Sequence, residues 1–280
     1  MKKLLFISVF SLSVGFAGAQ GNISNLTQAG SENASEVTQV GATNTSTVLQ
    51  QDDTNITTVS QAGSANSSEA QSVGGENNLS ITQVGSLNSN VILAGADGNT
   101  SLVSQDGSGN NTRQELNAQG GDALSIQEGD NNKVVQIQGG VGANTSYSQQ
   151  LGNDNVSTQS QNGENNAVFV DQIGDGGSSF IEQVGTSNNL AARQEGAGNT
   201  LNVSQDGSNN FAGGENDVLL DQFGNNNDII LIQQGSQNAA AIIQSGNSNE
   251  AVNTQAGLGN NSRIQQLGNR NSASVTQSEN

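Results

Sequence analysis

Polar and apolar positions alternate along nearly the whole chain. Within one unit, asparagine, two small or apolar residues and glutamine occupy every second position, as in Asn227, Ile229, Leu231 and Gln233. A period of two is typical of a β-strand with one buried face. The segment that follows contains a glycine, which permits the positive φ of a tight turn. Each unit therefore predicts one short strand followed by one turn.

The unit Q-x-G-x-x-N-x-x-x-x-x returns every eleven residues, and it is most regular between Asp228 and Gln277. We expect the inward amides to stack in ladders, and those that best define the pattern are Asn22, Gln28, Asn33, Gln39, Asn199, Gln205, Asn227, Gln233, Asn238, Gln244, Asn249, Gln255, Asn260, Gln266, Asn271 and Gln277. The corresponding turn glycines are Gly30, Gly41, Gly235, Gly246, Gly257 and Gly268.

A short fixed period indicates a stacked repeat architecture. Two units make a strand-turn-strand-turn rung of 22 residues, and about 23 units fill the chain, with one residue inserted near Val141 and about six around FAGGEN. We predict an all-β fold for residues 20–280, a β-solenoid of two facing parallel sheets with about 11 or 12 rungs.

The composition alone, with 36 glycines and many Asn, Gln and Ser residues, would be typical of a disordered chain. The ionisable residues argue against disorder, because all that can be placed in the repeat fall in turns or on the outward face, leaving the inward face without charge. A disordered segment has no reason to separate charges in this way.

Residues 1–19 have the features of a secretory signal peptide. Lys2 and Lys3 precede an apolar run from Leu4 to Phe16, and Ala17-Gly18-Ala19 supplies small residues for cleavage. We therefore expect a secreted mature chain that begins at Gln20. No later segment is apolar enough to insert into a membrane.

Charge and missing residue types exclude several functions. Beyond the predicted signal peptide, five basic residues face 25 acidic ones, which argues against nucleic acid as a partner. The chain has no His and no Cys, so the commonest general base and the usual soft metal ligands are absent. The acidic pair Asp217 and Asp221 has the residue types of a glycosidase site, but no pocket-forming residues accompany it. We expect no catalytic site, no cofactor and no metal site.

The repeats resemble the curlin repeat of the curli fibre family. NNLSITQVGSLNSNVIL, from Asn77 to Leu93, and NTLNVSQDGSNN, from Asn199 to Asn210, show its Gln, turn glycine and Asn at the same spacing. The resemblance implies a β-solenoid subunit that polymerises into extracellular, cell-surface amyloid fibres used in adhesion and biofilm matrix. It also implies an outer-membrane secretion pore and a nucleator homologue as partners. This chain departs from the major subunits in having about twice as many repeats and no separate targeting segment before the first repeat.

Self-assembly also follows from the pattern itself. The repeat runs from Asn22 to Gln277, so both end rungs should offer unpaired backbone and unpaired amides that a second copy can satisfy. The alternative is a β-solenoid that does not polymerise, either an adhesin or an ice-binding protein. A regular outward array of Thr would favour ice binding, whereas the outward positions here mix Asn, Glu, Thr, Val and Arg.

Overall fold

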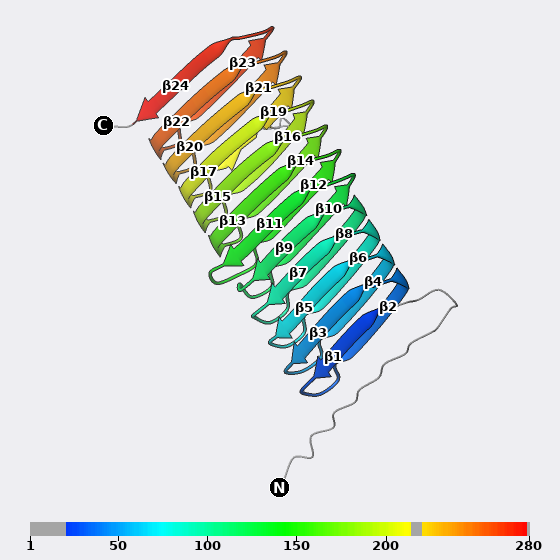
Figure 1. Cartoon of the computed structure of the whole chain (residues 1–280). Coiled ribbons are helices and arrows are strands. Elements are labelled where there is room, and N and C mark those ends of the chain that lie inside the picture. Colours follow the sequence, from blue (N-terminus) through cyan, green and yellow to red (C-terminus); the bar gives the residue numbers. More distant parts are fainter. Residues whose placement is uncertain (1–20, 214–219, 279–280) are drawn as a thin grey trace.

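The computed structural model describes residues 21–213 and 220–278. Throughout these residues the regular structure consists of parallel β-strands, stacked into one elongated pile with β1 at one end and β24 at the other (Figure 1). The part of the chain that the structure describes contains no helix able to cross a membrane. The predicted signal peptide, residues 1–19, lies outside the described residues.

Successive strands belong alternately to two sheets. The first sheet contains β1 (Ile23–Gln28), β3 (Thr45–Gln51), β5 (Ser67–Val73), β7 (Ser89–Ala94), β9 (Asn111–Leu116), β11 (Lys133–Gly139), β13 (Val156–Glu164), β15 (Ser178–Thr186), β17 (Thr200–Ser208), β20 (Asp228–Ser236), β22 (Glu250–Leu258) and β24 (Ser272–Ser278). The second contains β2 (Ala34–Ala42), β4 (Ile56–Ser64), β6 (Asn78–Ser86), β8 (Thr100–Ser108), β10 (Asp122–Glu128), β12 (Thr145–Leu151), β14 (Ala167–Ile173), β16 (Asn189–Glu195), β18 (Phe211–Ala212), β19 (Leu220–Phe223), β21 (Ala239–Ser245) and β23 (Asn261–Leu267).

The register confirms the predicted β-solenoid with 22-residue rungs. Gln161 lies beside Gln183, which lies beside Gln205, and each residue of these strands pairs with the residue 22 positions away. Side chains point alternately inward and outward, so β21 has the burial pattern intermediate, buried, intermediate, buried. The period of two in the sequence is thus the period of a strand with one dry face.

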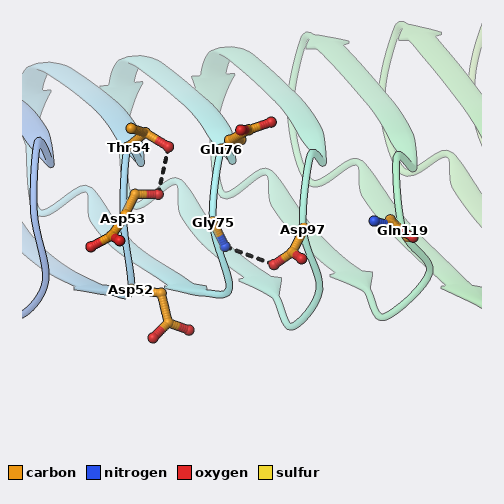
Figure 2. A pocket seen from close by; sticks show the side chains of 7 residues that line it. All are labelled: Asp52, Asp53, Thr54, Gly75, Glu76, Asp97 and Gln119. Atoms are coloured by element: carbon orange, nitrogen blue, oxygen red, sulfur yellow. Dashed lines mark hydrogen bonds between the residues drawn. The ribbon is translucent and has the colours of Figure 1, made fainter.

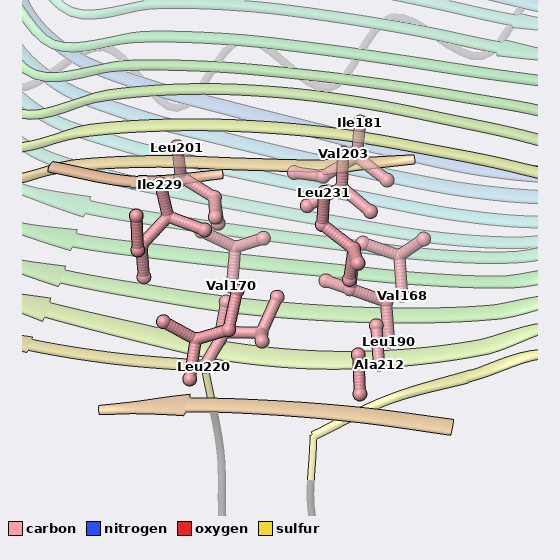
Figure 3. Packing of buried hydrophobic residues seen from close by; sticks show 14 of the residues in the cluster. Val168, Val170, Ile181, Leu190, Leu201, Val203, Ala212, Leu220, Ile229 and Leu231 are labelled. Atoms are coloured by element: carbon pink, nitrogen blue, oxygen red, sulfur yellow. The ribbon is translucent and has the colours of Figure 1, made fainter. Parts of the chain in front are cut away.

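The space between the sheets is filled by aliphatic side chains from both of them. Figure 3 shows Val170 and Leu220 of the second sheet facing Leu201 and Ile229 of the first. All four side chains are buried, with exposed fractions of 1 % or less. Burying one such side chain stabilises a fold by about 1.5–3 kcal/mol. These aliphatic pairs therefore hold the two sheets together through an interior that is otherwise polar.

Two insertions interrupt the 22-residue spacing without breaking the sheets. The residue added near Val141 lengthens a turn, and Val141 is 81 % exposed while Gln138 still pairs with Gln161. In the second interruption β18 and β19 form the two halves of one arm, because both pair with β16 and with β21. Insertions are accepted between strands because only the strand register has to be conserved for stacking.

The turns bring backbone atoms of successive rungs into close contact. At Gly185, φ is 113°, a conformation open essentially to glycine only. A Cβ atom placed there would lie 1.9 Å from the carbonyl oxygen of Gly207 in the next rung. Glycine is therefore required both by the backbone conformation and by the distance between layers.

We predict that Gly185→Ala destabilises the fold by at least about 1–2 kcal/mol, the cost of a left-handed conformation for an L-residue, before the overlap with Gly207 is added. Gly176→Asn is the matched control, because φ is 67° and nothing lies within 4 Å of a Cβ there, and asparagine tolerates this conformation. Guanidinium unfolding followed by circular dichroism measures both variants. Equal midpoints for the two would contradict the steric argument.

Candidate assembly site

Glutamine side chains form rows along the interior, and the row of the first sheet is interrupted at Ser72, Ala94 and Leu116. The Nε2 of Gln183 donates to the Oε1 of Gln205 at 2.7 Å, Gln205 donates to Gln233 at 2.8 Å, and Gln233 donates to Gln255 at 2.9 Å. In each bond the residue from the earlier rung is the donor. The rows are therefore directional, because every amide presents its oxygen to the rung before and its nitrogen to the rung after.

The second N–H of each glutamine fixes this direction. The Nε2 of Gln183 also donates to the backbone carbonyl of Ala167 at 3.0 Å, and that of Gln205 to Asn189 at 3.2 Å. Ala167 and Asn189 begin strands of the opposite sheet, so each amide joins two rungs and both sheets. Reversing one amide would place its oxygen against a carbonyl oxygen and lose both donated bonds.

Asparagine side chains close the turns. The Nδ2 of Asn227 donates to the carbonyls of Phe223 at 3.3 Å and Gly246 at 2.9 Å. Its Oδ1 accepts the backbone N–H of Asn249 in the next rung at 3.1 Å. Each asparagine thus satisfies buried backbone groups that the sharp turn leaves without strand partners.

The residues that the sequence singled out all lie on these rows or turns, but their burial differs with position. The interior ones are 2 % exposed or less, namely Asn199, Gln205, Asn227, Gln233, Asn238, Gln244, Asn249 and Gln255. Gln266 is 5 % exposed. Those at the two ends of the stack are only partly buried, namely Asn22, Gln28, Asn33, Gln39, Asn260, Asn271 and Gln277. The six glycines named above lie in turns and have positive φ.

A second inward glutamine row was missed from the sequence. Gln114 donates to Gln136 at 2.7 Å, and Gln136 donates to Gln159 at 3.3 Å. These residues stand two positions before the regular glutamine position, where most units have a Val, Ile or Ala. Their recurrence in three consecutive strands of the first sheet was the available signal.

Both end rungs pair on one side only within the described chain. β1 and β24 are the outermost strands of the first sheet, and β2 and β23 are the outermost arms of the second. Leu26 and Val37 pack against the core at one end, and Ala273 and Val275 at the other, but all four are only partly buried. The ends therefore present unpaired strand edges around a partly open apolar centre.

Acidic residues gather on the turns instead of the interior. Figure 2 shows Asp52, Asp53, Glu76 and Asp97 around a shallow depression formed by successive turns. There the carboxylate of Asp97 accepts the backbone N–H of Gly75 at 2.8 Å, so it links the turns of two adjacent rungs. The described residues contain no group of three or more His, Cys, Asp or Glu placed to hold a metal ion.

Some outward carboxylates are shifted by their neighbours. Partial burial raises the pKa of Asp171 and of Asp221, and the adjacent Arg193 guanidinium opposes the rise in both. Partial burial also raises the pKa of Asp228, and the negative charge of Glu250 adds to this effect. Asp228 and Glu250 are register partners on adjacent strands, so stacking forces two like charges together.

We predict that Gln233→Ala strongly destabilises the solenoid. The change leaves Gln205, Gln255 and the carbonyl of Phe211 without their partners, and a buried unsatisfied group costs about 1–3 kcal/mol. The neighbouring Gln234 is exposed, so Gln234→Ala is the matched control and should change stability by less than about 0.5 kcal/mol. Guanidinium midpoints measure both, and a loss of similar size at both positions would contradict a special role for the row.

We predict that Asp228→Asn stabilises the fold at pH 7 by a few tenths of a kcal/mol, about the cost of a like-charge cross-strand pair. The folded pKa of Asp228 lies above the unfolded value, so its contribution is favourable below about pH 4 and is lost as pH rises through the folded pKa. The variant should therefore also gain less stability on acidification.

The matched control is Glu182→Gln, because the register partners of Glu182 are Ser160 and Ser204. Guanidinium midpoints at pH 7 and pH 4 check the prediction. An Asp228→Asn midpoint at pH 7 that is equal to or below that of the unchanged chain would contradict it.

Comparison with known proteins agrees with this geometry. Residues 224–257 match the family model of the curlin associated repeat. The matched segment covers β20, β21 and most of β22, where the spacing of Gln, Gly and Asn is most regular. No curated protein matches the chain. Residues 224–257 therefore carry a curlin associated repeat, and the same rung geometry recurs from β1 to β24, which supports an assignment of the chain to the curlin-repeat family.

Proposed function

We propose that this protein is a secreted structural subunit that stacks end to end into extracellular, curli-like amyloid fibres. The observation that carries the proposal is the state of the two end rungs: β1, β2, β23 and β24 each have one edge without a strand partner in the described chain. Such edges are templates for further pairing, and a second copy offers the matching strand.

The amide rows support the same conclusion. The Oε1 atoms of Gln28 and Gln39 have no donor among the described residues, whereas Gln266 and Gln277 each donate only to a backbone carbonyl. Most interior glutamines both donate to and accept from a glutamine of an adjacent rung, as Gln205 and Gln233 do. Stacking one copy on the next continues these rows, and it also covers the partly open apolar centre at each end.

The family supports a structural role in place of an enzymatic one, and it is associated with extracellular fibres. We assign the fibres to adhesion and to the biofilm matrix. Residues 1–19 would direct secretion, with the mature chain starting at Gln20. An outer-membrane pore for export and a homologous nucleator are the partners that this route requires.

The many outward acidic residues would slow the association of copies and limit sideways aggregation. The formal net charge of the chain is −18, so copies repel one another in solution and along the sides of a fibre. Growth at an end brings few charges together, because the contacting layers are mainly backbone, amide and aliphatic groups. Repulsion therefore suppresses sideways association more than end-to-end growth.

We predict that residues 20–280, purified under denaturing conditions and then transferred to buffer, form unbranched fibres. X-ray diffraction should show the strand spacing of about 4.7–4.8 Å along the fibre axis, because stacking continues the sheets. Preformed fibre fragments should remove the lag phase of thioflavin fluorescence. A chain that folds to β-structure but stays monomeric at high concentration would contradict the proposal and favour a non-polymerising adhesin or ice-binding protein.

A further inference from the structure

Within the described residues, the two sheets contain unequal numbers of arms. The described residues place twelve strands in the first sheet. The second sheet has twelve strand segments, but β18 and β19 are halves of one arm, so it has eleven arms. The last strand, β24, therefore extends one layer beyond β23 (Figure 1).

The total number of arms is therefore odd, which restricts how a second copy can be added. If the next subunit kept the same orientation, its first sheet would continue on β24 and one layer above β23 would stay empty. A vacancy of one strand spacing, about 4.8 Å, would recur at every junction and break the amide row in that sheet. A rotation by half a turn about the stacking axis removes the vacancy, because the longer sheet of one copy then continues the shorter sheet of the other.

Resting on the proposed function, we propose that consecutive subunits are related by about half a turn, with β1 pairing on β23 and β2 pairing on β24 of the preceding copy. Asn22 and Gln28 then lie over Asn260 and Gln266. The two arms of a rung have the same spacing of Asn, Gln and turn glycine, so either sheet can accept either arm.

The amide directions match at this junction. Gln244 donates to the Oε1 of Gln266, whose Nε2 in turn donates to the carbonyl of Glu250 and keeps its second N–H. In the half-turn arrangement that N–H reaches the free Oε1 of Gln28 in the next subunit. If two copies met through their first rungs, glutamine oxygens would face each other, and if they met through their last rungs, glutamine N–H groups would face each other. The junction is therefore head to tail.

The asparagines match in the opposite sense. In the interior the Oδ1 of each asparagine accepts the backbone N–H of the asparagine one rung later, as Asn249 does from Asn271 at 3.0 Å. Asn271 has no such donor among the described residues. The backbone N–H of Asn33 occupies the required position in the next copy.

The charges of the two end rungs are complementary. The rung formed by residues 22–39 contains Glu32 and Glu36 and no basic residue, whereas the rung formed by residues 260–277 contains Arg263 and Arg270 and no acidic residue. The half-turn places Glu32 over Arg270, since each precedes the asparagine of its arm and each has φ of 59°. Without the rotation, the turn containing Glu32 would lie over the glycine-rich turn at residues 256–259 instead. Charge complementarity therefore favours the rotated junction.

Cysteine pairs distinguish the two junctions, because the natural chain contains no cysteine. Thr27, Thr38, Gln265 and Thr276 are exposed, uncharged and equivalent in position within their arms. The half-turn places Thr27 beside Gln265 and Thr38 beside Thr276 of the neighbouring copy, whereas unrotated stacking places Thr27 beside Thr276. We would prepare fibres of residues 20–280 from three double variants, T27C/Q265C, T38C/T276C and T27C/T276C.

The fibres are treated with a bifunctional thiol reagent that spans about 5 Å, one strand spacing, and are then dissolved in denaturant. We expect covalent multimers from T27C/Q265C and T38C/T276C, and monomers from T27C/T276C. The first two variants show that every cysteine used in the third can react.

Multimers from T27C/T276C, or none from the other two variants, would overturn the half-turn while leaving fibre formation intact. Fibres that fail to form from the unchanged chain would instead overturn the proposed function, and the junction with it. The two failures are therefore distinguishable.

Discussion

The structure depends above all on one interaction, namely the hydrogen bonding of like amides stacked from rung to rung. A buried amide without a partner costs more than a satisfied one contributes, so the interior favours Asn and Gln stacked in rows over isolated buried amides. This preference favours strands in register, since Gln205, Gln233 and Gln255 can bond only if their strands are aligned. Aliphatic pairs such as Leu201 and Val170 add cohesion between the sheets but would tolerate slips that the amides do not.

The same interaction explains what could be predicted from the sequence. The fold class, the rung length and the pairing of sheets follow from periodicity, because each unit repeats the same local preference for strand and turn. The second glutamine row at Gln114, Gln136 and Gln159 was not predicted, since it departs from the unit that defines the period. The pairing of Asp228 with Glu250 follows from the 22-residue rung, but the raised pKa of Asp228 could not be predicted, because it depends mainly on partial burial in the folded stack.

The outer surface provides the variety that the interior lacks. Most arms have Asn and Gln at the same inward positions, so an arm could pair with the wrong neighbour and still place amide on amide. Outward residues differ from arm to arm, and correct winding brings Asp171 next to Arg193 and Arg193 next to Asp221. Each carboxylate is partly buried there, which raises its pKa, while the guanidinium compensates. Outward charge thus helps to select among registers that the interior amides treat as equal.

At the two ends of the stack, interior amide bonding and outward charge both affect how a second copy can be added. The end rungs have Asn and Gln at the same inward positions as most interior layers, so on amide bonding alone a subunit could accept another copy in either sheet alignment. The unequal sheets remove one alignment, because it leaves a strand position empty. The acidic first rung and basic last rung oppose the contact of two like ends, because such a contact would bring charges of the same sign together. An odd number of arms and four charged side chains therefore suffice to give a direction and a rotation to an otherwise uniform stack.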